Sequence, residues 1–193
     1  MGQCRHRRRG QHVVAFAVIP VATMLLASCW DSTTPVMSAD EIAHRLSIAA
    51  RQRPPVYFVG TNYAGLPLTS IDNGTSRTWM YYGTCKYVDG SCDLPLEVET
   101  EPFHRGQWSG IVVDCYRLPD VDGVPAVSFG GDQVALFIGP VTVTVYGDPA
   151  RRIAAGVRAV GGLSSAPLPR PSAPTVRVVE RACGPVGPPD YPG

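Results

Sequence analysis

The chain has 193 residues, with 17 lysines and arginines against 16 aspartates and glutamates. Residues 1–28 hold four of the basic groups and no acidic one, so the remaining 165 residues (193 minus 28) carry 13 basic and 16 acidic groups, a net charge of −3. That length suffices for one domain with a core of its own. The negative balance argues against nucleic acid as a partner.

Residues 1–28 have the layout of a signal for export. A basic start around Arg7–Arg9 precedes the apolar stretch Val13–Ala27, and small residues stand at its end. The apolar stretch has 15 residues and contains Pro20, whereas a membrane-spanning helix needs about 20 apolar residues. We therefore expect this segment to be cleaved rather than kept as an anchor.

The signal ends in Leu26-Ala27-Ser28-Cys29, which resembles the lipobox of bacterial lipoproteins. The resemblance implies cleavage before Cys29 and a diacylglyceryl thioether on its sulfur. Because two acyl chains suffice for stable anchoring, we expect a lipid-anchored protein on the extracytoplasmic face of the cell membrane, with residues 29–37 as a tether. The alternatives are an ordinary secretory signal with a chance cysteine and an uncleaved membrane helix.

A domain is expected over residues 38–163, and it opens with a helix. Ser38 and Glu41 have the spacing of a capping box, apolar residues follow at helical spacing, and Pro54-Pro55 ends the run. Short strands come next, and Asp72-Asn73-Gly74 is the expected turn between the last two of them. These strands are expected at Val56–Gly60, Leu66–Ile71 and Arg77–Tyr82.

Aromatic residues are concentrated in the last of these strands. Strand alternation places Trp79 with Tyr81 on one face and Met80 with Tyr82 on the other. One pair should lie in the core. Tyrosine and tryptophan offer apolar area with a polar tip, so Trp79 and Tyr81 form a candidate binding face for sugar rings or for an apolar patch of a partner.

The segment Leu94–Thr100 also alternates, with Leu96 and Val98 on one face and glutamates on the other. Glu97, Glu99 and Glu101 thus share a face, which we expect to be solvated. Such a face can also attract a cation or a basic partner.

Four cysteines remain apart from Cys4 and Cys29, an even number that indicates disulfides in an exported chain. Of the three possible pairings we favour Cys85 with Cys92, around the turn at Val88-Asp89-Gly90, and Cys115 with Cys183. Their spacing does not fit a zinc site.

The second half of the domain continues with strands and a second helix. Asp148 and Pro149 are the start signals of that helix, and Gly161-Gly162 is its stop. Asp120-Val121-Asp122-Gly123 is interpreted as a turn, because it lacks the further acids of a calcium loop. The strands are expected at Gly110–Tyr116, Val124–Phe129, Val134–Ile138 and Val141–Tyr146, and the buried stripe of the helix at Ile153, Val157 and Val160.

Residues 164–193 contain eight prolines, so we expect a largely extended tail with one possible strand at Thr175–Val179, tied back by the disulfide at Cys183. The predicted fold class is α+β: an antiparallel sheet of six or more short strands with two helices, stabilised by disulfides. Four segments of the domain are similar to uncharacterised secreted proteins of GC-rich bacteria, which implies a recurring domain and no particular activity. They are Pro55–Gly60, Gly65–Leu68, Tyr82–Cys85 and Val141–Gly147.

Signatures of catalysis are few. The motifs G-x-S-x-G and S-x-x-K are absent, and after residue 28 the histidines are His44 and His104. We therefore expect no metal and no cofactor, and interpret the chain as a non-enzymatic envelope lipoprotein that binds a protein or a glycan. The alternative is an envelope hydrolase or transferase in which His104 acts as a base beside Glu97, Glu99 or Glu101.

Overall fold

The structure is a computed structural model that describes residues 36–88, 91–108, 115–129, 132–147, 149–162 and 166–184. Within these ranges, the side chains of residues 86–88, 91–92, 107–108 and 151 are not described. All of the described residues belong to one structural unit, Ser32–Gly193. The expected cleavage site, the lipidated Cys29 and the tether up to residue 35 lie outside the described residues.

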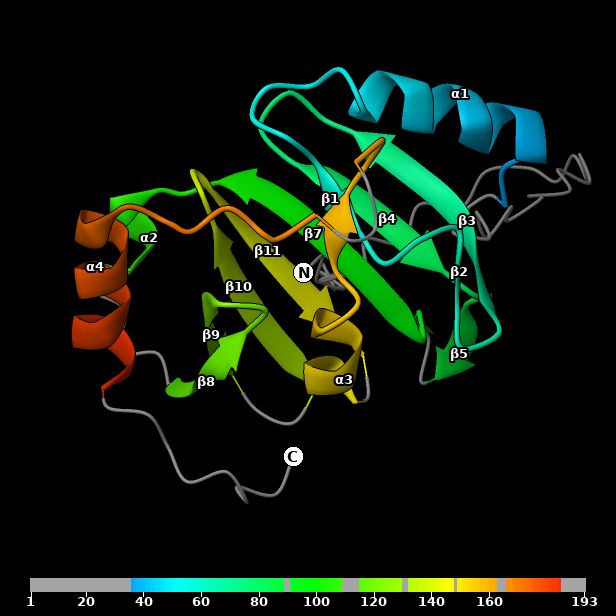
Figure 1. The fold of residues 1–193 in the computed structure, drawn as a ribbon. Helices are drawn as coiled ribbons and strands as arrows, with labels where there is room; N and C mark the ends of the chain where they lie inside the picture. Colours follow the sequence, from blue (N-terminus) through cyan, green and yellow to red (C-terminus); the bar gives the residue numbers. More distant parts are fainter. Residues whose placement is uncertain are drawn as a thin grey trace, which may run out of the picture. The chain divides into compact units, whose positions relative to one another are not determined.

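An eight-stranded antiparallel sheet forms the centre of this unit, with strand order β2-β3-β4-β7-β11-β10-β9-β8 (Figure 1). The hairpins β3/β4, β10/β11 and β8/β9 supply three of its seven pairings, and β7 pairs with β4 on one side and with β11 on the other. The strands are β2 (Asn62–Tyr63), β3 (Leu66–Asn73), β4 (Thr78–Tyr82), β7 (Leu96–Pro102), β8 (Tyr116–Val121), β9 (Val124–Ser128), β10 (Gln133–Ile138) and β11 (Val141–Tyr146). The expected α+β class with an antiparallel sheet is confirmed.

Two small sheets complete the strand content of the described chain. β1 (Tyr57–Phe58) pairs with β12 (Arg158–Ala159), and β5 (Lys86–Val88) pairs with β6 (Ser91–Asp93). The second pair is the hairpin expected between Cys85 and Cys92. Cys85 is disulfide-bonded, but the side chain of Cys92 lies outside the described residues, so their pairing stays a prediction.

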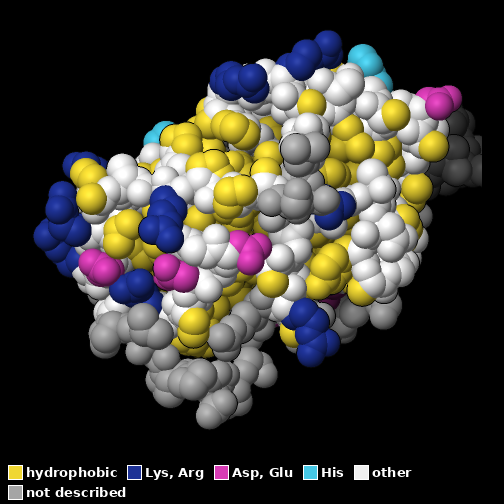
Figure 2. Space-filling view, viewed as in Figure 1, with side chains coloured by type: hydrophobic (Ala, Val, Ile, Leu, Met, Phe, Trp, Pro, Cys, Tyr) yellow, Lys and Arg dark blue, Asp and Glu magenta, His cyan; other side chains and the backbone are white. Residues whose placement is uncertain are grey.

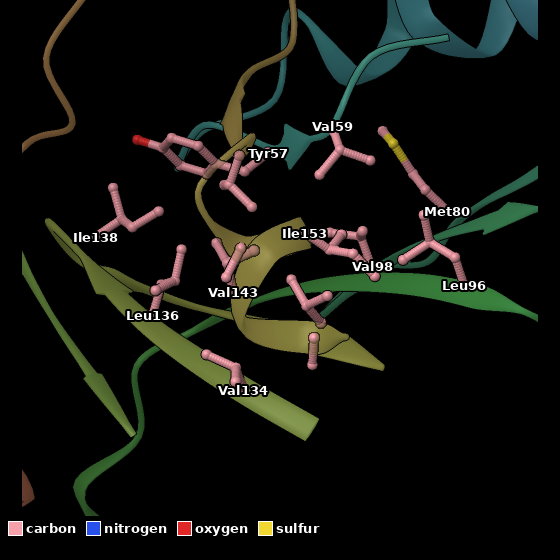
Figure 3. Close-up of a cluster of buried hydrophobic side chains, with 14 of the residues drawn as sticks. Tyr57, Val59, Met80, Leu96, Val98, Val134, Leu136, Ile138, Val143 and Ile153 are labelled. Atoms are coloured by element: carbon pink, nitrogen blue, oxygen red, sulfur yellow. The ribbon is translucent and has the colours of Figure 1, made fainter. Parts of the chain in front are cut away.

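One face of the central sheet carries the main core. Strand alternation directs Met80, Tyr82, Leu96 and Val98 to this face, where each is fully buried. Residues of α1 (Ala39–Ala49), α3 (Ala150–Ala154) and β1 pack against them, as the close-up in Figure 3 shows for Tyr57 and Ile153. Each such side chain contributes about 1.5–3 kcal/mol by leaving water, so this face accounts for most of the apolar stabilisation.

The helix α1 begins as the sequence predicts. Ser38 is its N-cap, and its side-chain oxygen accepts a hydrogen bond from the Glu41 backbone N–H at 3.2 Å. Such a cap typically contributes about 1 kcal/mol. The turn at Asp122 and Gly123 is also confirmed, since both residues adopt positive φ between β8 and β9.

The opposite face of the sheet is apolar only at one end. There Val127, Ala135 and Phe137 pack with Val179 and Cys183 of α4 (Ala173–Cys183). The helix α2 (Arg105–Trp108) lies next to α4. The disulfide Cys115–Cys183 is confirmed, with a Cα–Cα distance of 4.9 Å, and it fastens the end of α4 to the start of β8.

Two expectations for the C-terminal part are wrong. Thr175–Val179 is not a strand, and the segment from 166 to 184 is not mainly extended, because α4 forms there. The reason is local: the Ser172 hydroxyl accepts from the Thr175 backbone N–H at 3.4 Å, and Pro174 occupies the first turn, where a helix needs no N–H donor.

The second expected helix is also shorter than predicted, since α3 ends at Ala154. Val157 is buried in the main core after the helix has ended, and Arg158 and Ala159 pair with β1 instead. Gly156 follows the C-cap residue Ala155 and disfavours continuation of the helix. The strand expected at Gly110–Tyr116 starts at Tyr116 in the structure, and residues 110–114 lie outside the described residues.

Candidate functional site

Three adjacent strands place aromatic and acidic side chains on the sheet face opposite the main core. In the register of β4 with β7, Trp79 lies opposite Glu99 and Tyr81 lies opposite Glu97. In the register of β7 with β11, Glu97 lies opposite Tyr146. Because side chains of paired residues share a face, these five residues form one surface, which we call the aromatic–acidic face.

The aromatic rings of this face are in contact. The ring centroids of Trp79 and Tyr81 are 6.1 Å apart with planes at 3°, and those of Trp79 and Tyr146 are 5.5 Å apart with planes at 27°. All three side chains are partly buried. Met80 and Tyr82 are buried in the core, so the predicted separation of the two pairs of β4 is confirmed. Tyr146 was not among the predicted site residues.

Glu99 is held from two sides. Arg77 Nη1 donates to its Oε1 at 3.1 Å, and the Tyr146 hydroxyl donates to its Oε2 at 3.1 Å. The residue is only 5% exposed, so the expectation of a solvated outer face is wrong for Glu99. Burial raises its pKa above the ordinary value, and the charge of Glu101 adds to this, while the bonds to Tyr146 and Arg77 oppose it.

Glu97 lies between Tyr81 and Tyr146 in the register of the sheet. It is partly buried, and it forms no hydrogen bond or ion pair with any residue that the structure describes. Loss of solvent and the neighbouring Glu99 charge raise its pKa. An acceptor that is partly desolvated and unpartnered is suited to bind a hydroxyl or ammonium group of a ligand.

The two tyrosines of the face remain neutral donors. Burial and then the nearby carboxylates raise the pKa of Tyr81, and the same causes raise that of Tyr146 well above its ordinary value. The Tyr146 hydroxyl is used by Glu99, whereas the Tyr81 hydroxyl makes no hydrogen bond within the described part of the chain. The face therefore offers one free phenolic group beside the free carboxylate of Glu97.

His104 does not join this arrangement. It is exposed in the loop between β7 and α2, and it forms neither a hydrogen bond nor an ion pair with a carboxylate of the described residues. The general-base arrangement that the alternative interpretation needs is thus not assembled in the described structure.

Asp120 belongs to the segment that we interpret as a turn rather than a calcium loop. Its Oδ1 lies 4.0 Å from Nη2 of Arg117.

No group of three or more potential metal ligands occurs among the residues that the structure describes. Within the same residues, no helix has the length and apolar character needed to cross a membrane. Comparison of the chain with models of protein families, with curated proteins and with solved structures gave no match. The function must therefore be argued from the site itself.

Proposed function

We propose that this protein is a non-enzymatic binding module of the bacterial envelope that is anchored through lipid on Cys29 and binds a glycan on the aromatic–acidic face. The observation that carries the binding part is the contact of Trp79 with both Tyr81 and Tyr146 beside Glu97, which has no partner among the described residues. The anchoring part rests on the lipobox resemblance at residues 26–29.

A glycan suits this face for two reasons. The C–H side of a sugar ring packs on tryptophan and tyrosine, which combine apolar area with a polar tip. Sugar hydroxyls need a small number of placed acceptors and donors, and the Glu97 carboxylate and the Tyr81 hydroxyl are one of each. Arg77 and Tyr146 fix Glu99 on the same face of β7, so this part of the surface is ordered before a ligand binds, which lowers the entropic cost of binding.

A basic segment of a protein partner is the second candidate. It is favoured by the two carboxylates of this face, Glu97 and Glu99, and by Asp72, which lies opposite Trp79 in the register of β3 with β4. The two candidates differ in salt dependence: contacts with a neutral glycan change little with ionic strength, whereas ion pairs weaken as salt screens them over about 10 Å at 0.1 M.

The test of glycan binding uses the full chain and titration calorimetry with soluble fragments of bacterial envelope polysaccharides, at low and at high salt. We expect Trp79→Ala to weaken binding at least tenfold and Tyr63→Ala to leave it unchanged. Tyr63 is a matched control because it is a partly buried tyrosine that packs against the main core, on the opposite side of the sheet. Binding that survives Trp79→Ala, or none with any fragment, contradicts the proposal.

The anchor is tested separately by intact mass and membrane partitioning in a bacterium that processes lipoproteins. We expect a mature chain that begins at a lipidated Cys29 and a Cys29→Ala variant that leaves the membrane fraction. An unmodified chain in the wild type would remove the argument for the membrane location. Such a result would not affect the proposal that the aromatic–acidic face binds a glycan.

A further inference from the structure

Three arginines meet at a cleft on the edge of the molecule, away from the aromatic–acidic face. Arg105 of α2 and Arg177 and Arg181 of α4 line a hollow of about 240 Å³, together with Pro174 and Val178. All three arginines are exposed. Figure 2 shows basic side chains at the α4 edge of the molecule, at the left of the view, with acidic side chains next to some of them. We call this hollow the arginine cleft.

The arginine cleft lacks a counter-charge in the described structure. None of its arginines forms an ion pair with a described residue, and the described residues that line it include no acid. Glu180 is the acidic residue of α4, but its carboxylate is used by Arg117 Nη1 at 3.0 Å. Three cations thus share a small volume without an anion of the described chain to balance them.

Folding does not explain this arrangement. Arg177 and Arg181 are four residues apart on one helix, a spacing at which like charges destabilise the helix. Arg181 lies in the last turn, where a cation interacts favourably with the helix dipole. Arg177 has no such compensation. An anionic ligand between the arginines would relieve the repulsion.

We propose that the arginine cleft binds a phosphate group. The planar guanidinium matches phosphate oxygens with two parallel N–H bonds, and three of them surround a single anionic group from two helices. The volume is below the range of about 300–1,000 Å³ that holds whole drug-sized ligands, so a small group enters while the rest of the ligand stays outside.

The helix α4, which carries Arg177 and Arg181, is held firmly against the sheet. Val179 and Cys183 of α4 are buried against the sheet, and Cys183 is bonded to Cys115. The backbone positions of Arg177 and Arg181 are therefore fixed before binding, which reduces the ordering cost. The phosphate can come from a free phosphate ion or from the headgroup of an anionic phospholipid, since both present the same oxygens.

The experiment measures thermal denaturation of the full chain in zwitterionic detergent, because a ligand that binds the folded state raises the midpoint. One arm adds sodium phosphate against sodium chloride of equal ionic strength. The other adds phosphatidylglycerol against phosphatidylcholine in the micelles. Arg177→Gln, Arg105→Gln and Arg177→Lys are compared with Arg51→Gln, a control that removes an exposed arginine elsewhere.

We expect a higher midpoint in at least one arm, with affinity lowered about tenfold or more in both glutamine variants and unchanged in Arg51→Gln. Arg177→Lys should lose part of the affinity, because lysine keeps the positive charge but cannot donate two parallel N–H bonds to phosphate. A response to phosphate identifies the free ion as a ligand, and a response only to phosphatidylglycerol identifies the headgroup. The proposal is overturned if the midpoint rises in neither arm. It is also overturned if Arg177→Gln and Arg105→Gln show the same rise as the wild type.

Discussion

The substitution Glu97→Gln separates binding from stability at the aromatic–acidic face. Glu97 and Glu99 are two residues apart on β7, which places their side chains about 6.7 Å apart along the strand. Two charges at that distance repel by about 0.6 kcal/mol in water and about 2.5 kcal/mol at an effective dielectric constant of 20. Because Glu97 has no described partner to lose, the glutamine variant should be about 1 kcal/mol more stable at pH 7.

The stability gained by Glu97→Gln depends on pH, and the direction of this dependence follows from the raised pKa of Glu97. The pKa of Glu97 is raised in the folded protein, so between the unfolded and folded pKa values the folded state binds more protons than the unfolded state. Stability therefore falls as pH rises through this window. The advantage of the variant should be absent near pH 4, grow above the ordinary carboxyl range, and become constant once Glu97 is ionised in the folded state.

Urea unfolding at several pH values measures this effect, with Asp93→Asn as the control for loss of one exposed acid. The same variant should bind envelope glycan at least tenfold more weakly. Glu97→Gln that is destabilised by more than about 1 kcal/mol at pH 7 would mean that the carboxylate has a structural partner, and the reasoning about a free acceptor would be refuted.

Three further variants test the sheet and the attachment of α4 to it. Tyr146→Phe should lower the free energy of unfolding by about 1.5–3 kcal/mol at neutral pH and raise the pKa of Glu99, because Glu99 Oε2 loses its hydrogen-bond donor. Titration of the carboxyl groups by NMR measures this pKa, and an unchanged value would contradict the prediction. Thr142→Val should be neutral or up to about 1 kcal/mol stabilising in urea unfolding, since Thr142 is 1% exposed and its buried hydroxyl has no hydrogen-bond partner among the described residues. A loss of stability would reveal a partner. Replacing both Cys115 and Cys183 by serine should lower the free energy of unfolding by about 4 kcal/mol by the loop-closure relation, because their disulfide joins residues 68 positions apart. Calorimetric melting of the variant and the wild type measures this difference. A difference below about 1 kcal/mol would mean that α4 is held by packing alone.

The elements that the sequence predicts well are those with local signals. The capping box at Ser38, the turn at Asp122 and Gly123 between β8 and β9, and the alternation in β4 each depend on a few neighbouring residues. Strand alternation alone is enough to separate Trp79 and Tyr81 from Met80 and Tyr82. For the same reason, the sequence predicts that Glu97 and Glu99 share a face, so four of the five residues of the aromatic–acidic face are named from the sequence.

The fifth residue, Tyr146, and the meeting of the aromatic pair with the acidic pair depend on contacts between distant strands. Tyr146 reaches Trp79 and Glu99 only because β7 pairs with both β4 and β11, and alternation within one strand does not determine which strands are neighbours. A signal existed in the alternating threonines that precede Tyr146 in β11, which place it on the polar side. The helix α4 is not evident from the sequence, because Pro174 is compatible with a helix only in its first turn, and that position depends on Ser172 being the N-cap.

The two faces of the sheet differ in a way that bears on function. On the core face, alternate positions of β4, β7 and β11 are filled mainly by apolar side chains that are fully buried, such as Met80, Val98 and Val143. On the other face, the same strands carry Glu97 and Glu99, whose charged forms are disfavoured by burial. A sheet selected only for stability would carry apolar or neutral side chains at these positions, as it does under α4. Glu99 has donors in Arg77 and Tyr146, and the proposed ligand would supply the donor that Glu97 lacks among the described residues.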